Sequence, residues 1–319
     1  MAETGKNIEE AARLLSQGQL VAIPTETVYG LAANALDETA VLAIFAAKNR
    51  PFFDPLIVHI HNIESLHRYA VLSDERLRLL AQHFWPGPLT LLLPKTELIP
   101  DLVTSGLNQV AVRIPNHPLT LRLLQSLPFP LAAPSANPFG YVSPTQSSHV
   151  NDQLGEQVSY ILEGGPSTVG LESTIVGMED QTLCVYRLGG LAIEDIENVA
   201  GPAELRLNQS SNPKAPGQLK SHYAPKTKLL LGPINTLLQT YAKVPKAVLY
   251  MGPSRASEPN TLFLNLSESS NLNEAALRLF KLLRMADNSG KELVLCEEVP
   301  ETGLGRAIND RLRRAATRE

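Results

Sequence analysis

The chain has 319 residues, of which 44% are hydrophobic and 19% are charged, and its formal net charge is −4. This composition is typical of a folded globular protein and excludes a disordered chain, while the length predicts one large domain and a smaller one. Acidic residues slightly outnumber basic ones, so the chain as a whole does not attract nucleic acid or an anionic membrane. Any site for a polyanion must therefore be local.

Helix and strand patterns alternate from the N-terminus. Residues 8–15 have helical spacing that Gly18 ends, and a short buried strand is expected at 20–23. The start of the chain carries acidic residues where a signal peptide would have a basic segment and an apolar core. No apolar run approaches the roughly 20 residues that cross a bilayer. We therefore expect a cytoplasmic protein with no membrane attachment.

The next segments continue the alternation. Asp37 is a good N-cap for a helix that ends at Lys48. A buried strand is expected at 56–60, a long helix capped by Ser73 comes next, and another strand is expected at 89–93.

Short strand patterns dominate the following part of the chain, and each is bounded by Gly, Pro, Ser or Asn. They lie in QVAVRIP (109–115), FPLAAPSAN (129–137), SYILEGG (159–165), ESTIVG (172–177) and LCVYRLGG (183–190). Many strands with few helices between them predict an α/β domain with a large, strongly curved mixed sheet.

Composition changes between about residues 203 and 226, where Ser, Asn, Pro, Gly and Lys replace the apolar periodicity, as in a linker. Beyond it, strand patterns such as KAVLYMG alternate with helical ones such as NEAALRLFKLLRMAD, which predicts a small parallel-sheet, Rossmann-like α/β domain. The predicted organisation is a large domain at 1–203, a linker at 204–226 and a small domain at 227–319.

Several common signatures are absent from the sequence: a Walker-type phosphate loop, H-E-x-x-H, paired C-x-x-C and G-x-S-x-G. Cys184 and Cys296 lie in apolar runs, so buried thiols are favoured over a disulfide or a reactive pair. His59 and His61 are expected on one face of a strand. Since the sequence offers no third ligand, a satisfied histidine or a substrate contact is favoured over zinc. The metal question is left open.

Basic and hydroxyl side chains occur near several strand ends. Lys48 and Arg50 follow a helix, where the helix dipole explains cations about as well as an anion site does. Arg113 is explained equally by an edge strand facing water and by an anion site. Turn chemistry alone explains the hydroxyls and amide of APSAN at 133–137. Taken together, these groups suit a small zwitterion and a polyphosphate in one cleft.

The order of motifs is specific. PTETVYGL (24–31), KNRP with PLIVHI (48–60), WPGPLTLLL (85–93), VAVRIP (110–115), APSAN (133–137) and GLESTIV (170–176) resemble the YrdC-like threonylcarbamoyl-AMP synthase family. APGQLKSHYAP (215–225) and GLGRAINDRLRRAA (303–316) resemble its long, two-domain form. The resemblance implies a YrdC-like catalytic domain at 1–203.

The resemblance also implies an activity. The family's nucleotidyltransferases join L-threonine, bicarbonate and ATP, with Mg²⁺, into threonylcarbamoyl-AMP and release pyrophosphate. Downstream threonylcarbamoyl-transfer proteins then modify tRNA next to the anticodon, so tRNA would be an indirect partner only. The reaction depends mostly on positioning and on charge stabilisation, and no covalent nucleophile is required.

The resemblance assigns residues to each substrate. L-threonine would be bound by Thr27, His59, Arg113, Ala133 and Ser173, and ATP by Lys48, Arg50, Asp54, Gln109, Ser135, Asn137, Ser143 and Arg187. Lys48 and Arg50 would stabilise charge on the departing pyrophosphate.

The resemblance also bears on other positions. His222 and Tyr223 belong to a segment expected to fold over the cleft as a lid. Tyr29 is expected to help wall the pocket. Asp54 stands where the family pattern has asparagine, and a carboxylate there would repel the ATP phosphates unless it faced the metal or water. Glu26 has no role that the sequence explains beyond shaping a turn.

Two other functions compete with this one. A carbamoyl-transferring maturation factor with a YrdC-like module would carry zinc-binding cysteine clusters, and two isolated cysteines argue against it. An RNA-binding module is disfavoured by the net charge of −4, by the aromatic content of 5% and by the lack of an arginine-rich run.

Overall fold

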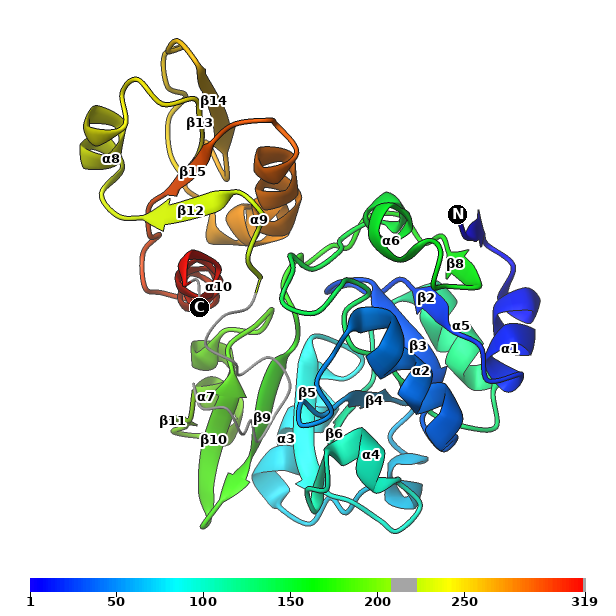
Figure 1. The fold of residues 1–319 in the computed structure, drawn as a ribbon. Coiled ribbons are helices and arrows are strands. Elements are labelled where there is room, and N and C mark those ends of the chain that lie inside the picture. Colours follow the sequence, from blue (N-terminus) through cyan, green and yellow to red (C-terminus); the bar gives the residue numbers. More distant parts are fainter. Residues whose placement is uncertain (208–222, 318–319) are drawn as a thin grey trace.

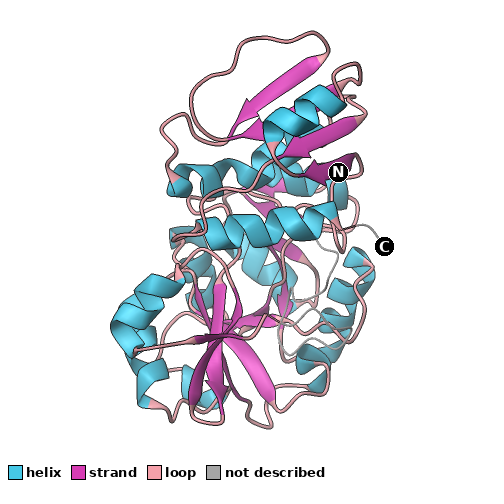
Figure 2. Cartoon of the chain, turned by 90° about the vertical axis from the view of Figure 1, so that its left-hand side faces the viewer, coloured by secondary structure: helices cyan, strands magenta, loops and turns pink. Residues whose placement is uncertain are grey.

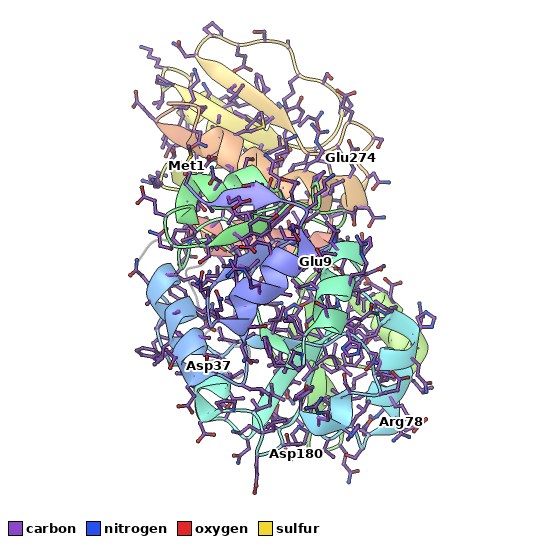
Figure 3. The ribbon with its side chains drawn as sticks, turned by 90° about the vertical axis from the view of Figure 1, so that its right-hand side faces the viewer. Met1, Glu9, Asp37, Arg78, Asp180 and Glu274 are labelled. Carbon is purple, nitrogen blue, oxygen red and sulfur yellow. The ribbon has the colours of Figure 1, made fainter. Side chains whose placement is uncertain are left out.

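The structure is a computed structural model that describes residues 1–207 and 223–317. It contains a large and a small sheet, and each sheet packs against its own set of helices (Figure 1). Figure 2 shows the smaller sheet above the larger one, with helices packed around both. In Figure 3, Glu274 of the small domain lies in the upper part of the molecule, and Asp180, between two strands of the large domain, lies near its lower end.

Among the described residues, the large sheet has eleven strands in the order β1-β8-β2-β3-β7-β4-β6-β5-β9-β10-β11. Their bounds are β1 Glu3–Gly5, β2 Val21–Ile23, β3 Gly30–Asn34, β4 Ile57–His59, β5 Leu89–Pro94, β6 Gln109–Arg113, β7 Leu131–Ala132, β8 Tyr160–Leu162, β9 Thr174–Glu179, β10 Thr182–Arg187 and β11 Glu204–Leu205. The sheet contains both parallel pairs, such as β4 with β6, and antiparallel pairs, such as β5 with β6. The predicted mixed sheet is confirmed.

Helices cover this sheet: α1 Ile8–Ser16, α2 Glu38–Lys48, α3 Glu75–Phe84, α4 Asp101–Thr104, α5 Pro118–Ser126, α6 Ser147–Leu154 and α7 Ile193–Ala200, with a short 3₁₀ turn, η1, at Leu66–Arg68. The Asp37 cap and the end of α2 at Lys48 are confirmed, because the Asp37 carboxylate accepts from the backbone N–H of Thr39 and Asn49 turns left-handed.

One prediction about a helix is wrong. The cap of α3 is Asp74, not Ser73: the Asp74 carboxylate accepts from the N–H groups of Arg76 and Leu77. Few helices were expected between the strands at 109–190, and α5 and α6 are the two that lie there, with nine and eight residues. Helices this short show too few periodic positions to stand out from strand patterns.

The small domain has a four-stranded parallel sheet in the order β12-β15-β13-β14. Its elements are β12 Lys228–Leu231, α8 Ile234–Thr240, β13 Lys246–Tyr250, β14 Thr261–Asn265, α9 Leu272–Asp287, β15 Leu293–Cys296 and α10 Gly305–Ala316. The predicted Rossmann-like domain is thereby confirmed. The exact boundaries at 203 and 226 remain predictions, and β11 lies at the start of the expected linker.

One hydrophobic core runs through both domains. It includes Val112 of β6, Leu171 of the large domain and Leu279 of α9, all fully buried. The predicted burial of both thiols is confirmed, since Cys184 and Cys296 are buried and not in a disulfide. Over residues 1–207 and 223–317, no helix has the length and apolar character needed to span a membrane.

Candidate functional site

A small cavity of about 50 Å³ lies where several strands of the large sheet end. We call it the cleft. Its lining comes from the β2–β3 loop, the ends of β4, β6 and β10, the segment after β7, the start of β9 and the chain that enters the small domain. The lining residues are Thr25, Thr27, Val28, Gly30, Arg50, Ile57, His59, Arg113, Ala133, Pro134, Ser135, Glu172, Ser173, Arg187 and Tyr223.

The cleft brings together most of the residues singled out in the sequence. All five threonine candidates line it (Thr27, His59, Arg113, Ala133 and Ser173), as do Arg50, Ser135, Arg187 and Tyr223. Lys48, Asp54, Asn137 and Ser143 are buried in the layer behind the lining.

Other residues lie elsewhere. Gln109 is at the opposite end of β6 from Arg113, paired with Pro94, and is not brought to the cleft. His61 follows the end of β4 and is partly exposed, so it does not share the position of His59. Tyr29 is also outside the lining, because its hydroxyl points away and donates to the carbonyl of Gly165 at 2.8 Å. His222 lies outside the described residues.

Arg113 is held in a fixed orientation. β6 lies between β4 and β5, so the arginine is not on an edge strand facing water, and that reading is wrong. Its Nε donates to the carbonyl of Gly87 at 3.1 Å, its Nη1 donates to Thr27 Oγ1 at 2.7 Å, and its Nη2 lies 2.6 Å from Glu26 Oε1. Glu26 thus has a role as the buried counterion of Arg113.

The turn that carries Thr27 is built by Thr25. The Thr25 hydroxyl accepts from the backbone N–H groups of Thr27 and Val28, both at 3.2 Å, and donates to the carbonyl of Val28 at 2.6 Å. This hydroxyl-centred turn gives hydrogen-bond partners to the backbone groups that follow the end of β2, and it places Thr27 in the lining of the cleft. Thr25 therefore shapes this turn.

His59 is neutral in this environment. Burial and the charge of Arg113 lower the pKa of His59 to about 3, while Nδ1 lies 3.2 Å from the carbonyl of Ile57. In the part of the chain that the structure describes, no group of three His, Cys, Asp or Glu side chains is placed to hold a metal ion. The structure therefore supports a satisfied histidine on the cleft wall.

Arg50 lines one side of the cleft, and Lys48 is buried behind it. Lys48 Nζ donates to the carbonyl of Ser135 at 2.5 Å and to that of Asn137, and burial lowers the pKa of Lys48 well below its usual value. Arg50 Nη2 lies 2.9 Å from Asp54 Oδ2. Asp54, which is fully buried and outside the lining, is therefore a counterion of Arg50.

Ser173 and Arg187 form the opposite wall. Arg187 donates from Nε to the Ser173 carbonyl and from Nη2 to the Ser173 hydroxyl, both at 3.0 Å, and Thr90 Oγ1 lies 2.7 Å from the same hydroxyl. Burial lowers the pKa of Arg187 to about 10, which still leaves it protonated near neutrality.

Sequence reasoning missed two residues of this wall. Glu172 lines the cleft, and Arg311 of α10 donates to its Oε2 from Nε at 3.2 Å and from Nη2 at 3.0 Å. Each lies in a motif that carried the family resemblance, GLESTIV and GLGRAINDRLRRAA, which was the available signal. Tyr223, the expected lid residue, is 1% exposed and also lines the cleft.

Comparisons with known proteins agree along the whole chain. Residues 13–189 match the family model described as "Telomere recombination", and residues 191–317 match "Threonylcarbamoyl-AMP synthase, C-terminal domain". The threonylcarbamoyl-AMP synthase of Pyrococcus abyssi is 41% identical over 97% of this chain and 94% of its own length, and that of Bacillus subtilis is 38% identical over 97% and 92%.

Solved structures show the same likeness. The crystal structure of P. abyssi Sua5 complexed with L-threonine matches with a TM-score of 0.92 and 38% identity over 99% of this chain and 97% of that one. Full-length HypF in a phosphate- and nucleotide-bound form matches 58% of this chain with a TM-score of 0.52 and 23% identity, a likeness of fold alone.

The fold and the cleft define a two-domain α/β enzyme with a YrdC-like domain and a buried, arginine-rich site. The chain belongs to the threonylcarbamoyl-AMP synthase family.

Proposed function

We propose that the cleft is where this threonylcarbamoyl-AMP synthase binds L-threonine and ATP and joins them through bicarbonate. The single observation that carries the proposal is the convergence of Arg50, Arg113 and Arg187 on one buried cavity. A cavity with several arginines and few exposed carboxylates suits a ligand that carries both a carboxylate and a polyphosphate.

Arg113 is the proposed anchor for the threonine carboxylate. Its hydrogen bonds to Gly87 and Thr27 use one N–H on Nε and one on Nη1, while Nη2 faces Glu26 as an ion pair without a hydrogen bond. N–H groups on both terminal nitrogens therefore remain for a bidentate contact with a carboxylate. Neutral His59 and the hydroxyls of Thr27 and Ser173 supply further polar contacts around the amino acid.

The proposed ATP side consists of Lys48, Arg50, Ser135, Asn137, Ser143 and Arg187. A phosphate brought near Lys48 would raise its lowered pKa again and hold it as a cation. Arg50 keeps its charge because Asp54 sits behind it. Gln109 and Asp54, which were also candidates for direct ATP contacts, are not supported in that role by their positions.

The proposed reaction is that of the family. The threonine amine takes up carbon dioxide from bicarbonate with loss of water, and a carbamate oxygen attacks the α-phosphorus of ATP. The bond between the α- and β-phosphates breaks, and pyrophosphate leaves with the electron pair. The cleft contributes orientation of the two substrates and positive charge for the leaving group.

Mg²⁺ was expected with ATP, but the described residues do not form a site for it. Glu172 is held by Arg311 and Asp54 by Arg50, and no cluster of three candidate ligands occurs among the described residues. We propose that any Mg²⁺ enters on the ATP phosphates and their waters, as is common for this ion.

Release of pyrophosphate from ATP tests the proposal, with L-threonine or bicarbonate omitted in turn. We expect release only when all three substrates are present. Release that persists without threonine or without bicarbonate would overturn the function, and salt-sensitive tRNA binding without any ATP turnover would favour an RNA-binding module. The proposed place of action is the cytoplasm, and the product would pass to proteins that transfer the threonylcarbamoyl group to tRNA.

A further inference from the structure

The small domain reaches into the wall of the cleft. Figure 1 shows α9 and α10 on the side of the small sheet that faces the large domain. At Gly170, which has φ +82°, an added Cβ would lie 2.5 Å from the Cα of Leu277 in α9. The loop that leads to Glu172 and Ser173 is therefore packed directly onto a helix of the other domain, and only glycine fits there.

Arg311 of α10 is the central contact. It is fully buried and makes two hydrogen bonds to Glu172 Oε2, at 3.0 and 3.2 Å. Glu172 Oε1 accepts from Ser143 Oγ at 2.5 Å. A residue of the small domain thus fixes a cleft carboxylate, and this carboxylate in turn fixes the hydroxyl of a proposed ATP residue.

The same helices hold Tyr223. The Tyr223 ring stacks on Phe280 of α9 with ring centroids 5.5 Å apart. The guanidinium of Arg311, on α10, lies 5.1 Å from the centre of the Tyr223 ring. Tyr223 lines the cleft from this position.

A second arginine reinforces the loop that carries Ser143. Arg284 of α9 donates from Nε to the carbonyl of Ser143 at 3.3 Å and from Nη2 to the carbonyl of Val142. Both the backbone and the hydroxyl of Ser143 are therefore set by arginines of the small domain, directly or through Glu172.

Charge explains why Glu172 requires Arg311. The groups that face Glu172 are Arg311 on α10, Arg187 on β10, Ser143 on its loop, and Tyr223. Without Arg311, the buried carboxylate would compete with a phosphate for Arg187 and would repel the phosphate directly. The two hydrogen bonds from Arg311 to Glu172 Oε2 remove that competition before ATP arrives.

We propose that Arg311 is a positioning residue for the ATP side of the cleft, so that the small domain is a working part of the active site. It compensates the charge of Glu172 and, through Glu172 and Tyr223, sets the wall beside Ser143 and Arg187. The inference rests on the proposed function, because it assigns this wall to ATP.

The test compares full-length variants in which the charge is removed from one or both partners. Arg311→Gln is expected to raise KM for ATP by about tenfold or more, with a smaller effect on KM for threonine. Glu172→Gln combined with Arg311→Gln removes both charges and is expected to recover most of the ATP affinity. Arg311→Lys keeps the charge but not both hydrogen bonds to Glu172 Oε2, so its KM for ATP should lie between those of the wild type and Arg311→Gln.

The matched control is Arg306→Gln. Arg306 is also on α10 and pairs with Glu194 of the large domain, but this pair is partly exposed and outside the cleft. We expect wild-type kinetics from this variant, which would show that loss of an arginine between the domains is not itself the cause.

Several results would overturn the inference. They are an unchanged KM for ATP in Arg311→Gln, equal losses for both substrates, or a folded double variant that stays as defective as the single one. If Arg311→Gln alone does not fold, the double variant decides the question by the same criterion. Calorimetric titration with ATP gives a readout separate from turnover, and failure of the wild type to require threonine would count against the proposed function instead.

Discussion

Variants of the buried pair of Arg113 and Glu26 should affect the free energy of unfolding and the affinity for threonine differently. Their side chains are only 4% and 6% exposed, and the charged atoms are 2.6 Å apart. Arg113→Gln leaves the Glu26 carboxylate buried without its counterion, so both the free energy of unfolding and the threonine site are disturbed. Combining Glu26→Gln with Arg113→Gln removes the buried charge altogether.

The expected magnitudes follow from the burial. Breaking a buried ion pair by removing one partner costs about 3–5 kcal/mol of unfolding free energy. The double variant should regain most of this loss, because neither amide carries charge. It should not regain threonine affinity: losing a charge-assisted bidentate contact costs about 1.5–3 kcal/mol, or roughly 10-fold to 100-fold in Kd.

Guanidinium unfolding and calorimetric threonine titration measure the two quantities on the same preparations. Arg13→Gln is the control, because Arg13 also pairs with a glutamate, Glu10, but its side chain is 53% exposed. An exposed pair contributes little, so neither quantity should change. A stable double variant that binds threonine as tightly as the wild type would refute Arg113 as the carboxylate anchor.

Three further predictions follow from buried groups. Lys48→Met should raise KM for ATP with little change in threonine affinity, measured by initial rates and titration, and equal losses for both would contradict the assignment. Burial, with the charges of Arg284 and Lys281, lowers the pKa of His149 from 6.5 to about 4. Between these pH values the unfolded state binds more protons than the folded state, so the free energy of unfolding falls by up to about 1.4 kcal/mol for each pH unit of acidification. Denaturant midpoints between these pH values should show a smaller slope in His149→Gln, and an unchanged slope would assign the acid sensitivity elsewhere. Both cysteines should react with a thiol reagent only as fast as the protein opens, and rapid labelling of the native protein would contradict their burial.

Local patterns in the sequence predicted much of the architecture. Asp37 and Lys48 bound α2 as expected, because a capping carboxylate and a helix end are encoded within a few residues. The parallel small sheet was recognisable from strands and helices in regular alternation. Ser73 was wrong as a cap because Asp74 beside it is as good a capping residue, and only the structure shows which one accepts the hydrogen bonds.

Roles that depend on distant contacts could not be predicted. Glu26 and Arg113 are far apart in the chain, and so are Glu172 and Arg311, so neither pair is visible as a spacing. Asp54 looked misplaced near phosphates until the structure put it behind Arg50. In each case the carboxylate faces an arginine, and the charge of this arginine compensates that of the carboxylate, which would otherwise have met a charged ligand.

The most direct test of the central claim is the mass of the product formed in the cleft. The enzyme would be incubated with ATP, L-threonine and bicarbonate labelled with heavy carbon, and the products separated and weighed. The account predicts an adenylate that contains threonine and one labelled carbon, formed in clearly smaller amounts by the stable Glu26→Gln and Arg113→Gln double variant at a threonine level that only just saturates the wild type. An adenylate without the label, or one formed equally well by the double variant, would contradict it.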